Sequence, residues 1–235
     1  MGNSLRLDKY ISNATDLSRT DVKKLIKAGQ VSIDDEIAAN GAQKISSEQS
    51  VSIDGSTIQL LNNRYFMMNK PPGVVSATKD HGNPTAIDLI YEHRNQQLQI
   101  AGRLDIDTTG LLLITDDGQW NHIVTSPRTD CKKIYLVELE NPVGEDYQKK
   151  LEAGIALEGE KRRCLPATME VLDDHHIRLS ISEGKYHQVK RMMTSLGNQV
   201  VSLHRLQIGG IALDPELAPG DYRPLTEDEI ASIHE

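Results

Sequence analysis

Alternating apolar and polar positions predict several strands, and the clearest lies in the middle of the chain. Within Lys133–Leu139, apolar or aromatic residues occupy every second position from Tyr135 onward, the period of a strand with one buried face. Leu111–Ile114 is apolar throughout and bounded by turn residues, as is typical of a buried strand. Further strands are predicted at Val31–Ile33, Val51–Ile53, Thr57–Leu60, Tyr65–Met68, Val74–Ser76, Ala167–Leu172, Ile177–Ile181, Val200–Leu206 and Ile208–Leu213.

Helical patterns are fewer. Ser18 and Asp21 resemble a capping box and predict a helix from Arg19 to Ala28, with apolar residues on one face and lysines on the other. Other helices are predicted at Ala86–Glu92, through Trp120–Ile123 with Asp117 as its cap, at Glu145–Ala153 and at His187–Leu196. Runs of strands with few helices predict an α+β fold with a mixed, mostly antiparallel sheet.

The pattern of predicted elements changes near residue 60. Residues 1–60 combine the lysine-bearing helix with short strands and are predicted to form a small separate domain. Residues 61–64 are a plausible linker, and residues 65–235 are predicted to form a second, larger domain.

The 235 residues carry a formal net charge of −8, which argues mildly against nucleic acid as a partner. The distribution of charge changes this picture. Basic residues cluster at Arg19–Lys27, Arg128–Lys133 and Lys185–Arg191, while acidic residues gather after Asp214. Local positive patches on an acidic protein can bind phosphates.

Composition also bears on the compartment. Cys131 and Cys164 lie far apart without paired spacing, which argues against a zinc site or a disulfide framework and fits a reducing cytoplasm. No apolar run approaches the roughly 20 residues of a membrane helix, and the start of the chain lacks the apolar segment of a secretory signal. We therefore expect a cytoplasmic protein without a membrane partner or a metal.

The segment Gly102–Asp105 is the first candidate for chemistry. It places Arg103 two positions before a carboxylate, directly ahead of the predicted buried strand Leu111–Ile114. Taken alone, this spacing is more typical of a surface ion pair than of a functional site. The context decides between the two interpretations.

Four segments in order carry a resemblance to a known family: Asn69–Gly73, Gly102–Asp105, Lys133–Val137 and Glu183–Met192. Their order and spacing resemble the RsuA/RluB type of pseudouridine synthase, and residues 1–60 are similar to the S4-like RNA-binding domain of such enzymes. The resemblance covers nearly the whole chain. Three further segments, Asp107–Gly110, Thr115–Trp120 and Ala218–Thr226, resemble the members that act on small-subunit ribosomal RNA.

The resemblance implies an α+β pseudouridine synthase catalytic domain preceded by the S4-like domain. It implies isomerisation of one specific uridine in small-subunit ribosomal RNA, without cofactor or metal. The implied partner is ribosomal RNA or a partly assembled small subunit, and the implied state is a monomer.

The resemblance also assigns catalytic roles. Asp105 is the catalytic carboxylate, which could attack the anomeric carbon, attack the pyrimidine ring, or act as the base of an elimination. Lys190 supplies a positive charge where many relatives place arginine, with Arg191 as the alternative partner of Asp105. Tyr135 stacks on the target uracil, and Arg103 occupies the space that the extruded uridine leaves.

A wider set of residues is implied in RNA binding. The amino-terminal domain contributes Arg19, Lys23, Lys24 and Lys27, and the catalytic domain contributes Lys132, Lys133, Lys185, His187, Gln188, Arg191 and Arg205. Asp107 is interpreted as structural, capping or bonding the turn beside Thr108.

Two other function classes stay open at this point. The protein could be an RNA-binding assembly factor with an inactive catalytic fold, in which case binding would occur without turnover. It could also be a glycosidase-like hydrolase that uses Asp105 and Asp107 as paired carboxylates, in which case free uracil would be released.

Overall fold

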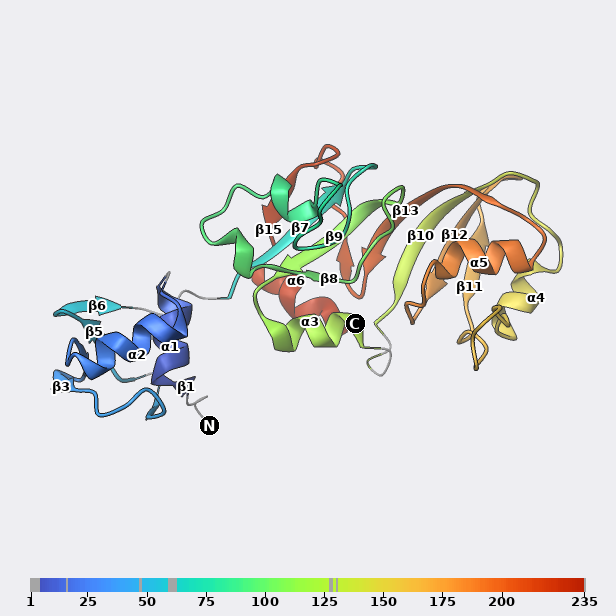
Figure 1. The fold of residues 1–235 in the computed structure, drawn as a ribbon. Coiled ribbons are helices and arrows are strands. Elements are labelled where there is room, and N and C mark those ends of the chain that lie inside the picture. Colours follow the sequence, from blue (N-terminus) through green and yellow to red (C-terminus); the bar gives the residue numbers. More distant parts are fainter. Residues whose placement is uncertain are drawn as a thin grey trace. The chain divides into compact units, whose positions relative to one another are not determined.

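The chain forms two compact units, 1–62 and 63–235, in a computed structural model (Figure 1). The structure describes residues 5–15, 17–46, 48–58, 63–126, 129 and 131–234. Residues 61 and 62 of the predicted linker, and Arg128 of one basic cluster, lie outside the described residues.

The described residues of the smaller unit form two short helices and two small sheets. Its elements are β1 (Leu5–Arg6), α1 (Leu7–Ala14), α2 (Arg19–Lys27), β2 (Val31–Ile33), β3 (Glu36–Ile37), β4 (Lys44–Ile45), β5 (Val51–Ile53) and β6 (Ser56–Ile58). The antiparallel order β3-β2-β5-β6 forms one sheet, and β1 pairs with β4. The predicted helix cap is confirmed, because the Ser18 side chain accepts a hydrogen bond from the Asp21 amide. Helix α1, which the pattern did not predict, contributes Leu7 and Ile11 to the core.

A nine-stranded sheet dominates the larger unit. Its strands are β7 (Tyr65–Lys70), β8 (Gln99–Ala101), β9 (Thr109–Thr115), β10 (Lys133–Leu139), β11 (Thr168–Val171), β12 (His176–Ile181), β13 (Val200–Ile208), β14 (Ile211–Ala212) and β15 (Tyr222–Pro224). The main order is β11-β12-β10-β13-β9-β7-β15, with β14 beside β13 and β8 beside β9. The β13–β9 pair is parallel and the other pairs are antiparallel, which confirms the predicted mixed α+β fold.

Helices pack on this sheet at several places. They are η1 (Ala86–Leu89), η2 (Asn95–Gln97), α3 (Gly118–Thr125), α4 (Tyr147–Glu152), α5 (Gln188–Ser195), α6 (Glu227–Ala231) and η3 (Ser232–His234). Asp117 caps α3 as predicted, because its side chain accepts hydrogen bonds from the amides of Gln119 and Trp120. Within the described ranges, no helix is both long and apolar enough to cross a membrane.

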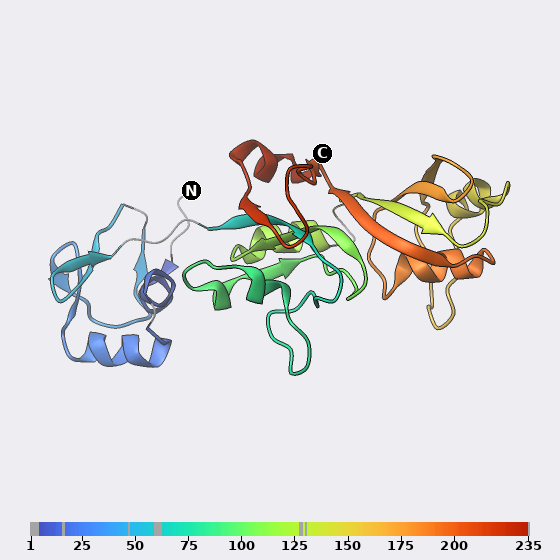
Figure 2. The same ribbon diagram turned by 90° about the horizontal axis from the view of Figure 1, so that it is seen from above.

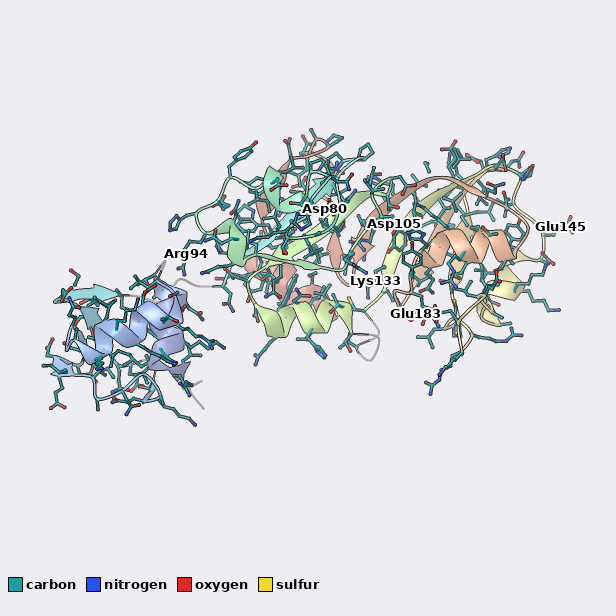
Figure 3. The ribbon with its side chains drawn as sticks, in the orientation of Figure 1. Asp80, Arg94, Asp105, Lys133, Glu145 and Glu183 are labelled. Carbon is teal, nitrogen blue, oxygen red and sulfur yellow. The ribbon has the colours of Figure 1, made fainter. Side chains whose placement is uncertain are left out.

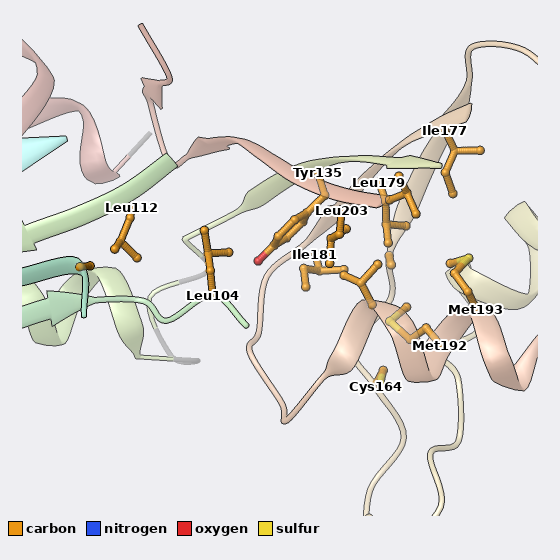
Figure 4. Close-up of a cluster of buried hydrophobic side chains, with 14 of the residues drawn as sticks. Leu104, Leu112, Tyr135, Cys164, Ile177, Leu179, Ile181, Met192, Met193 and Leu203 are labelled. Carbon is orange, nitrogen blue, oxygen red and sulfur yellow. The ribbon is translucent and has the colours of Figure 1, made fainter. Parts of the chain in front are cut away.

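Strand β9 is buried on both faces, as its unbroken apolar run predicted. Leu112 and Ile114 belong to one hydrophobic cluster, while Leu111 and Leu113 belong to another together with Trp120 of α3. The first cluster continues under α5, where the side chains of β10, β12 and β13 meet the methionines of the helix (Figure 4). One apolar cluster therefore connects the strands on both sides of the sheet centre.

Strand β13 joins the two parts of the sheet. It pairs with β10 along its length and with β9 at two register positions. Figure 2 shows this long strand, coloured orange to red, from above. Gly110 permits the second contact: a Cβ atom there would lie 2.3 Å from the Arg205 carbonyl oxygen, and its φ of +97° favours glycine. This close crossing brings Arg205 beside the segment that precedes β9.

Several predicted elements differ from the structure. Within the strand predicted at Ile208–Leu213, Ile208 ends β13, a turn follows at residues 209 and 210, and only Ile211–Ala212 form the short strand β14. The helix predicted at Ala86–Glu92 is only the short 3₁₀-helix η1, whose N-terminus is capped by a capping box between Thr85 and Asp88. Val74–Ser76 forms one isolated bridge, between Val75 and Thr85, rather than a strand. The Ser76 side chain bonds to the main chain of Leu104. The strand predicted from Val200 to Leu206 continues to Ile208, because Ile208 still pairs with Lys133.

Candidate functional site

A cleft of about 600 Å³ opens in the larger unit between the segment before β9 and the segment before α5. Asp105, Tyr135, His187 and Lys190 all line it. Figure 3 shows Asp105, Lys133 and Glu183 at the junction between the part of the unit that contains β9 and the part that contains α5. The structure thus brings together residues that lie up to 85 positions apart in the sequence.

The main chain around Asp105 is fixed by the segment that follows β7. The hydroxyl of Ser76 donates to the Leu104 carbonyl at 2.8 Å and accepts from the Leu104 amide at 3.0 Å. The Gly73 amide donates to the Ile106 carbonyl at 2.8 Å, and the Thr108 amide donates to the Asp105 carbonyl at 3.1 Å. The Asp105 side chain therefore projects from a constrained turn.

Lys70 holds the same turn from inside the protein. Its side chain is fully buried, and its ammonium donates to the carbonyls of Pro71 at 2.9 Å, Thr108 at 2.8 Å and Ile106 at 3.3 Å. Burial lowers the pKa of Lys70 to about 8, although the negative charges of Asp107 and Asp105 oppose the shift. A cation linking three carbonyls makes this residue a brace for the carboxylate-bearing turn.

Titration of Lys70 should be visible in the pH dependence of stability. Its pKa is about 8 in the folded protein against an ordinary 10.5, so between these values the unfolded chain binds more protons. The free energy of unfolding of the wild type should therefore rise from pH 8 to 10.5 relative to Lys70→Met, by roughly 2–3 kcal/mol. Urea denaturation of both proteins across this range measures the difference, and a difference independent of pH would contradict the assignment.

Asp105 faces two basic side chains across the cleft. Its carboxylate lies 3.3 Å from Lys190 Nζ and 3.5 Å from His187 Nε2, and about a quarter of its side chain (27%) is exposed. An ammonium at this distance offsets the negative charge of the carboxylate. Asp105 can therefore act as a nucleophile or a base while open to a ligand in the cleft.

Lys190 is shared between two carboxylates. Its ammonium donates to both oxygens of Asp107, at 2.6 and 2.8 Å, which is closer than its contact with Asp105. Burial lowers the pKa of Lys190, but the hydrogen bond with Asp107 and the charge of Asp105 outweigh it, so the pKa is raised. The bond from Lys190 likewise lowers the pKa of Asp107. We predicted that Asp107 caps or bonds the turn beside Thr108. In the structure its side chain instead accepts the hydrogen bonds of Lys190.

Arg191, the other basic residue considered beside Asp105, is engaged elsewhere. Its guanidinium donates to the Tyr186 carbonyl at 3.0 Å and to a carboxylate oxygen of Glu160 at 3.3 Å. It also donates to the Glu158 carbonyl. The geometry therefore places Lys190, and not Arg191, beside Asp105.

Tyr135 forms an aromatic wall of the cleft. The residue is 8% exposed, and Figure 4 shows its hydroxyl pointing away from the apolar cluster under α5 toward Leu104. Arg205 lies against it, with a guanidinium nitrogen 3.4 Å from the hydroxyl. Tyr135 thus lines the cleft together with Asp105, with apolar packing behind its ring.

Arg205 and Gln188 were both predicted to contact RNA, but their side chains form hydrogen bonds within the fold. Arg205 is buried, and its guanidinium donates to the carbonyls of Leu111 and Gly102, each at 2.8 Å. It thereby ties β13 to β9 and to the first residue of the Gly102–Asp105 segment. Gln188 is also buried, accepting from the Lys185 amide at 2.8 Å and donating to Glu183 at 3.0 Å.

The other predicted residues fall into three places. Arg103, Lys133, Lys185 and His187 line the cleft. Arg103 is exposed and makes no hydrogen bond or ion pair within the described part of the chain, whereas the Lys133 ammonium donates to the Cys131 carbonyl. Lys132 is exposed but is not among the lining residues. Arg19, Lys23, Lys24 and Lys27 are exposed on α2 of the smaller unit.

The cleft is suited to a flat polar ring attached to a charged backbone. An accessible carboxylate, a cation beside it and an aromatic wall can hold a planar base and act on it, while the exposed Arg103 can meet a phosphate or fill a vacated space. Among the described residues, no group of three or more His, Cys, Asp or Glu side chains could hold a metal ion. Tyr186, which the sequence analysis did not single out, also lines the cleft.

Comparison with known proteins agrees with this chemistry. Residues 64–195 match the family model described as RNA pseudouridylate synthase. The chain is 50% identical over 230 residues to the ribosomal small subunit pseudouridine synthase A of Yersinia pestis, covering 97% of this chain and 98% of the relative. It is equally identical over 230 residues to the protein of the same name from Escherichia coli (strain K12), covering 97% and 100%.

A solved structure shows the same likeness in three dimensions. The crystal structure titled as that of a pseudouridylate synthase superposes with a TM-score of 0.72 at 46% sequence identity. The match covers 98% of this chain and 100% of the other.

Proposed function

The chain belongs to the RNA pseudouridylate synthase family, and from this premise we propose that it converts one uridine of small-subunit ribosomal RNA to pseudouridine, with Asp105 as the catalytic carboxylate. That it is an RNA pseudouridine synthase follows from the family. The RNA class rests on the names of the relatives. The role of Asp105 rests chiefly on one observation: its carboxylate is open to the cleft and lies 3.3 Å from Lys190.

The reaction needs few groups. The bond between the anomeric carbon of the ribose and N1 of uracil breaks, the base turns, and a bond forms from the same sugar carbon to C5 of the ring, which then loses its proton. In this proposal Asp105 attacks the sugar, attacks the ring, or removes a proton from the sugar in an elimination. Lys190 offsets the charge of the Asp105 carboxylate, and Tyr135 stacks on the uracil with its hydroxyl near C5.

The uridine must leave the RNA stack to reach Asp105. Arg103 is exposed at the cleft two residues before Asp105, which supports a role in filling the vacated space. Lys133, Lys185 and His187 line the same cleft and support a role in holding the adjoining RNA. Because the side chains of Gln188 and Arg205 are bonded within the fold, we assign them to positioning the site rather than to phosphate contacts.

We assign RNA binding also to the smaller unit, as an S4-like domain. Three exposed cations of α2, Arg19, Lys23 and Lys27, support this, whereas Lys24 is paired with Asp21 at 2.8 Å. Replacing Arg19, Lys23 and Lys27 together by alanine should weaken RNA binding and reduce the slope of log Kd against log salt by about 2. Filter binding between 50 and 300 mM salt measures this change.

Lys24→Ala is the matched control for the α2 variant, because its charge is already offset by Asp21. It should change the slope by much less than one third of the triple variant's effect. The saturated rate of modification should be the same in all three proteins. An unchanged slope in the triple variant would leave α2 without a part in phosphate binding.

The remaining parts of the proposal concern setting. We propose that the protein acts as a monomer in the cytoplasm on ribosomal RNA or a partly assembled small subunit. The buried thiols of Cys131 and Cys164 are compatible with a reducing compartment.

Incubation with unmodified small-subunit ribosomal RNA, free or in assembling particles, tests the activity directly. The proposal predicts one pseudouridine, mapped by chemical derivatisation and primer extension, and no free uracil in the supernatant. Binding without turnover on every RNA would favour an assembly factor, and release of uracil would favour the hydrolase with paired carboxylates.

A further inference from the structure

Tyr186 is an exposed aromatic residue at the mouth of the cleft. Its exposed fraction is 71%, although it lines the same cleft as Asp105. Its aromatic ring therefore offers a flat surface to a ligand that enters the cleft. Tyr135, by contrast, is 8% exposed and lies deep in the same cleft.

The main chain around Tyr186 is fixed. The Tyr186 carbonyl accepts a hydrogen bond from Arg191 at 3.0 Å, the Lys185 amide donates to the Gln188 side chain at 2.8 Å, and the Gln188 amide donates to the Lys185 carbonyl at 3.2 Å. The exposed ring therefore stands on a constrained turn at the start of α5. Its presentation to solvent is a built feature of the fold.

The ring of Tyr186 is stacked on His187. The two ring centres lie 3.8 Å apart with an angle of 20° between the planes. His187 adopts a left-handed backbone conformation (φ 46°), which is uncommon for a residue other than glycine, and its Nε2 lies 3.5 Å from Asp105. The stack thus connects the mouth of the cleft with the catalytic carboxylate.

Single-stranded RNA is held mainly by stacking of bases on aromatic side chains together with positive charge along its backbone. Both elements occur here. Lys185 and Arg103 line the cleft with Tyr186, and Arg103 is exposed. When the target uridine turns into the cleft, the bases on either side of it lose a stacking partner and remain outside, at the level of the exposed ring.

We propose that Tyr186 is a stacking platform for the nucleobase directly beside the extruded uridine, on its 5′ or 3′ side. This inference rests on the proposed function, because it takes the flipped uridine at Asp105 as given. Tyr186 then contributes to substrate binding and to the choice of uridine, while Tyr135 contacts the target base itself.

The test combines variants of Tyr186 with RNA that lacks one base. The substrate is a small-subunit RNA fragment with the normal sequence, or with an abasic nucleotide on the 5′ or 3′ side of the target. Single-turnover kinetics give the enzyme concentration at half-maximal rate and the saturated rate. The proteins are the wild type, Tyr186→Ala, Tyr186→Leu, Tyr186→Phe and Tyr186→Trp.

On normal RNA, Tyr186→Ala and Tyr186→Leu should raise the half-saturating concentration by roughly fivefold to a hundredfold, whereas Phe and Trp should retain most of the affinity. On one of the two abasic substrates the half-saturating concentration of the wild type should rise by the same factor. That of Tyr186→Ala should be no higher there than on normal RNA. Tyr91→Ala is the matched control, because Tyr91 is 88% exposed in the same unit and is not among the residues that line the cleft. It should behave as the wild type on every RNA.

Three results would overturn the proposal. The half-saturating concentration of Tyr186→Ala could equal that of the wild type, or it could exceed the wild-type value by the same factor on the normal and both abasic RNAs. Tyr186→Ala could also lower the saturated rate alone. The last would mean that Tyr186 only supports His187. Affinities measured by fluorescence anisotropy with Asp105→Asn protein give the same comparison without turnover. A wild type that modifies no RNA would refute the proposed function, whereas the anisotropy comparison would still decide the role of Tyr186.

Discussion

Replacing Asp105 by asparagine is expected to lower the saturated single-turnover rate by about a thousandfold or more. The amide keeps the shape of the side chain but can neither attack carbon nor accept a proton as a carboxylate does. Because about a quarter of the side chain is exposed and the surrounding turn is held by main-chain bonds, the fold should be unaffected. Release of tritium from RNA labelled at C5 of uridine measures the rate.

The matched control for Asp105→Asn is Asp107→Asn. Asp107 lies two residues away, is 68% exposed at its side chain and binds the same lysine. Its replacement should lower the rate by less than about tenfold, because it leaves Lys190 beside Asp105. Comparable losses in the two variants would mean that the carboxylates work as a pair, as in the hydrolase alternative. Full activity of Asp105→Asn would remove the carboxylate from the mechanism.

Replacing Lys190 by methionine is expected to lower the saturated rate by about a hundredfold. The variant leaves Asp105 and Asp107 facing each other without the ammonium that lies 3.3 Å from the first and 2.6 Å from the second. Without the ammonium the two carboxylates repel each other, and the reacting carboxylate loses its electrostatic partner. The partial exposure of the site limits the loss, since water replaces some of the missing charge.

Lys190→Arg should retain activity within about tenfold, because it preserves the charge and offers a two-pronged donor to the carboxylate. RNA binding by Lys190→Met, measured by anisotropy, should be close to that of the wild type. Equal losses in Lys190→Met and Lys190→Arg would show that packing, rather than charge, matters at this position. The rate assay of the Asp105 variants applies here unchanged.

Local patterns predicted the elements that build the centre of the fold. The alternation in Lys133–Leu139 and the apolar run at Leu111–Ile114 correspond to β10 and to the core of β9. These predictions succeed because side-chain period and burial are local properties of a strand. The strand prediction at Val74–Ser76 was wrong, because its main chain pairs with Thr85 at a single bridge and the Ser76 side chain bonds the distant main chain of Leu104, which no local pattern encodes.

Motif spacing predicted which residues line the cleft, but not which of their side chains face the cleft and which form hydrogen bonds within the fold. Arg103, Asp105, Tyr135 and Lys190 all line it. Arg205 illustrates the limit, because a basic residue in a strand suggests a phosphate contact until the parallel crossing of β13 and β9 shows its donors on two carbonyls.

The contact of Lys190 with Asp107 and the exposure of Tyr186 could not be predicted from the sequence either. Both depend on how the start of α5 faces the turn after Gly102–Asp105, which is set by long-range packing. Tyr186 had one usable signal, since an aromatic residue between Lys185 and His187 is typical of RNA-binding surfaces.

Mapping pseudouridine in small-subunit ribosomal RNA from a strain that lacks this gene tests the central claim most directly. The strain is complemented with the wild-type gene or with Asp105→Asn at equal protein levels. We predict one uridine that is unmodified in the deletion strain, restored by the wild type and still unmodified with Asp105→Asn. An RNA whose pseudouridines are all retained in the deletion strain, or restoration by Asp105→Asn, would contradict the account.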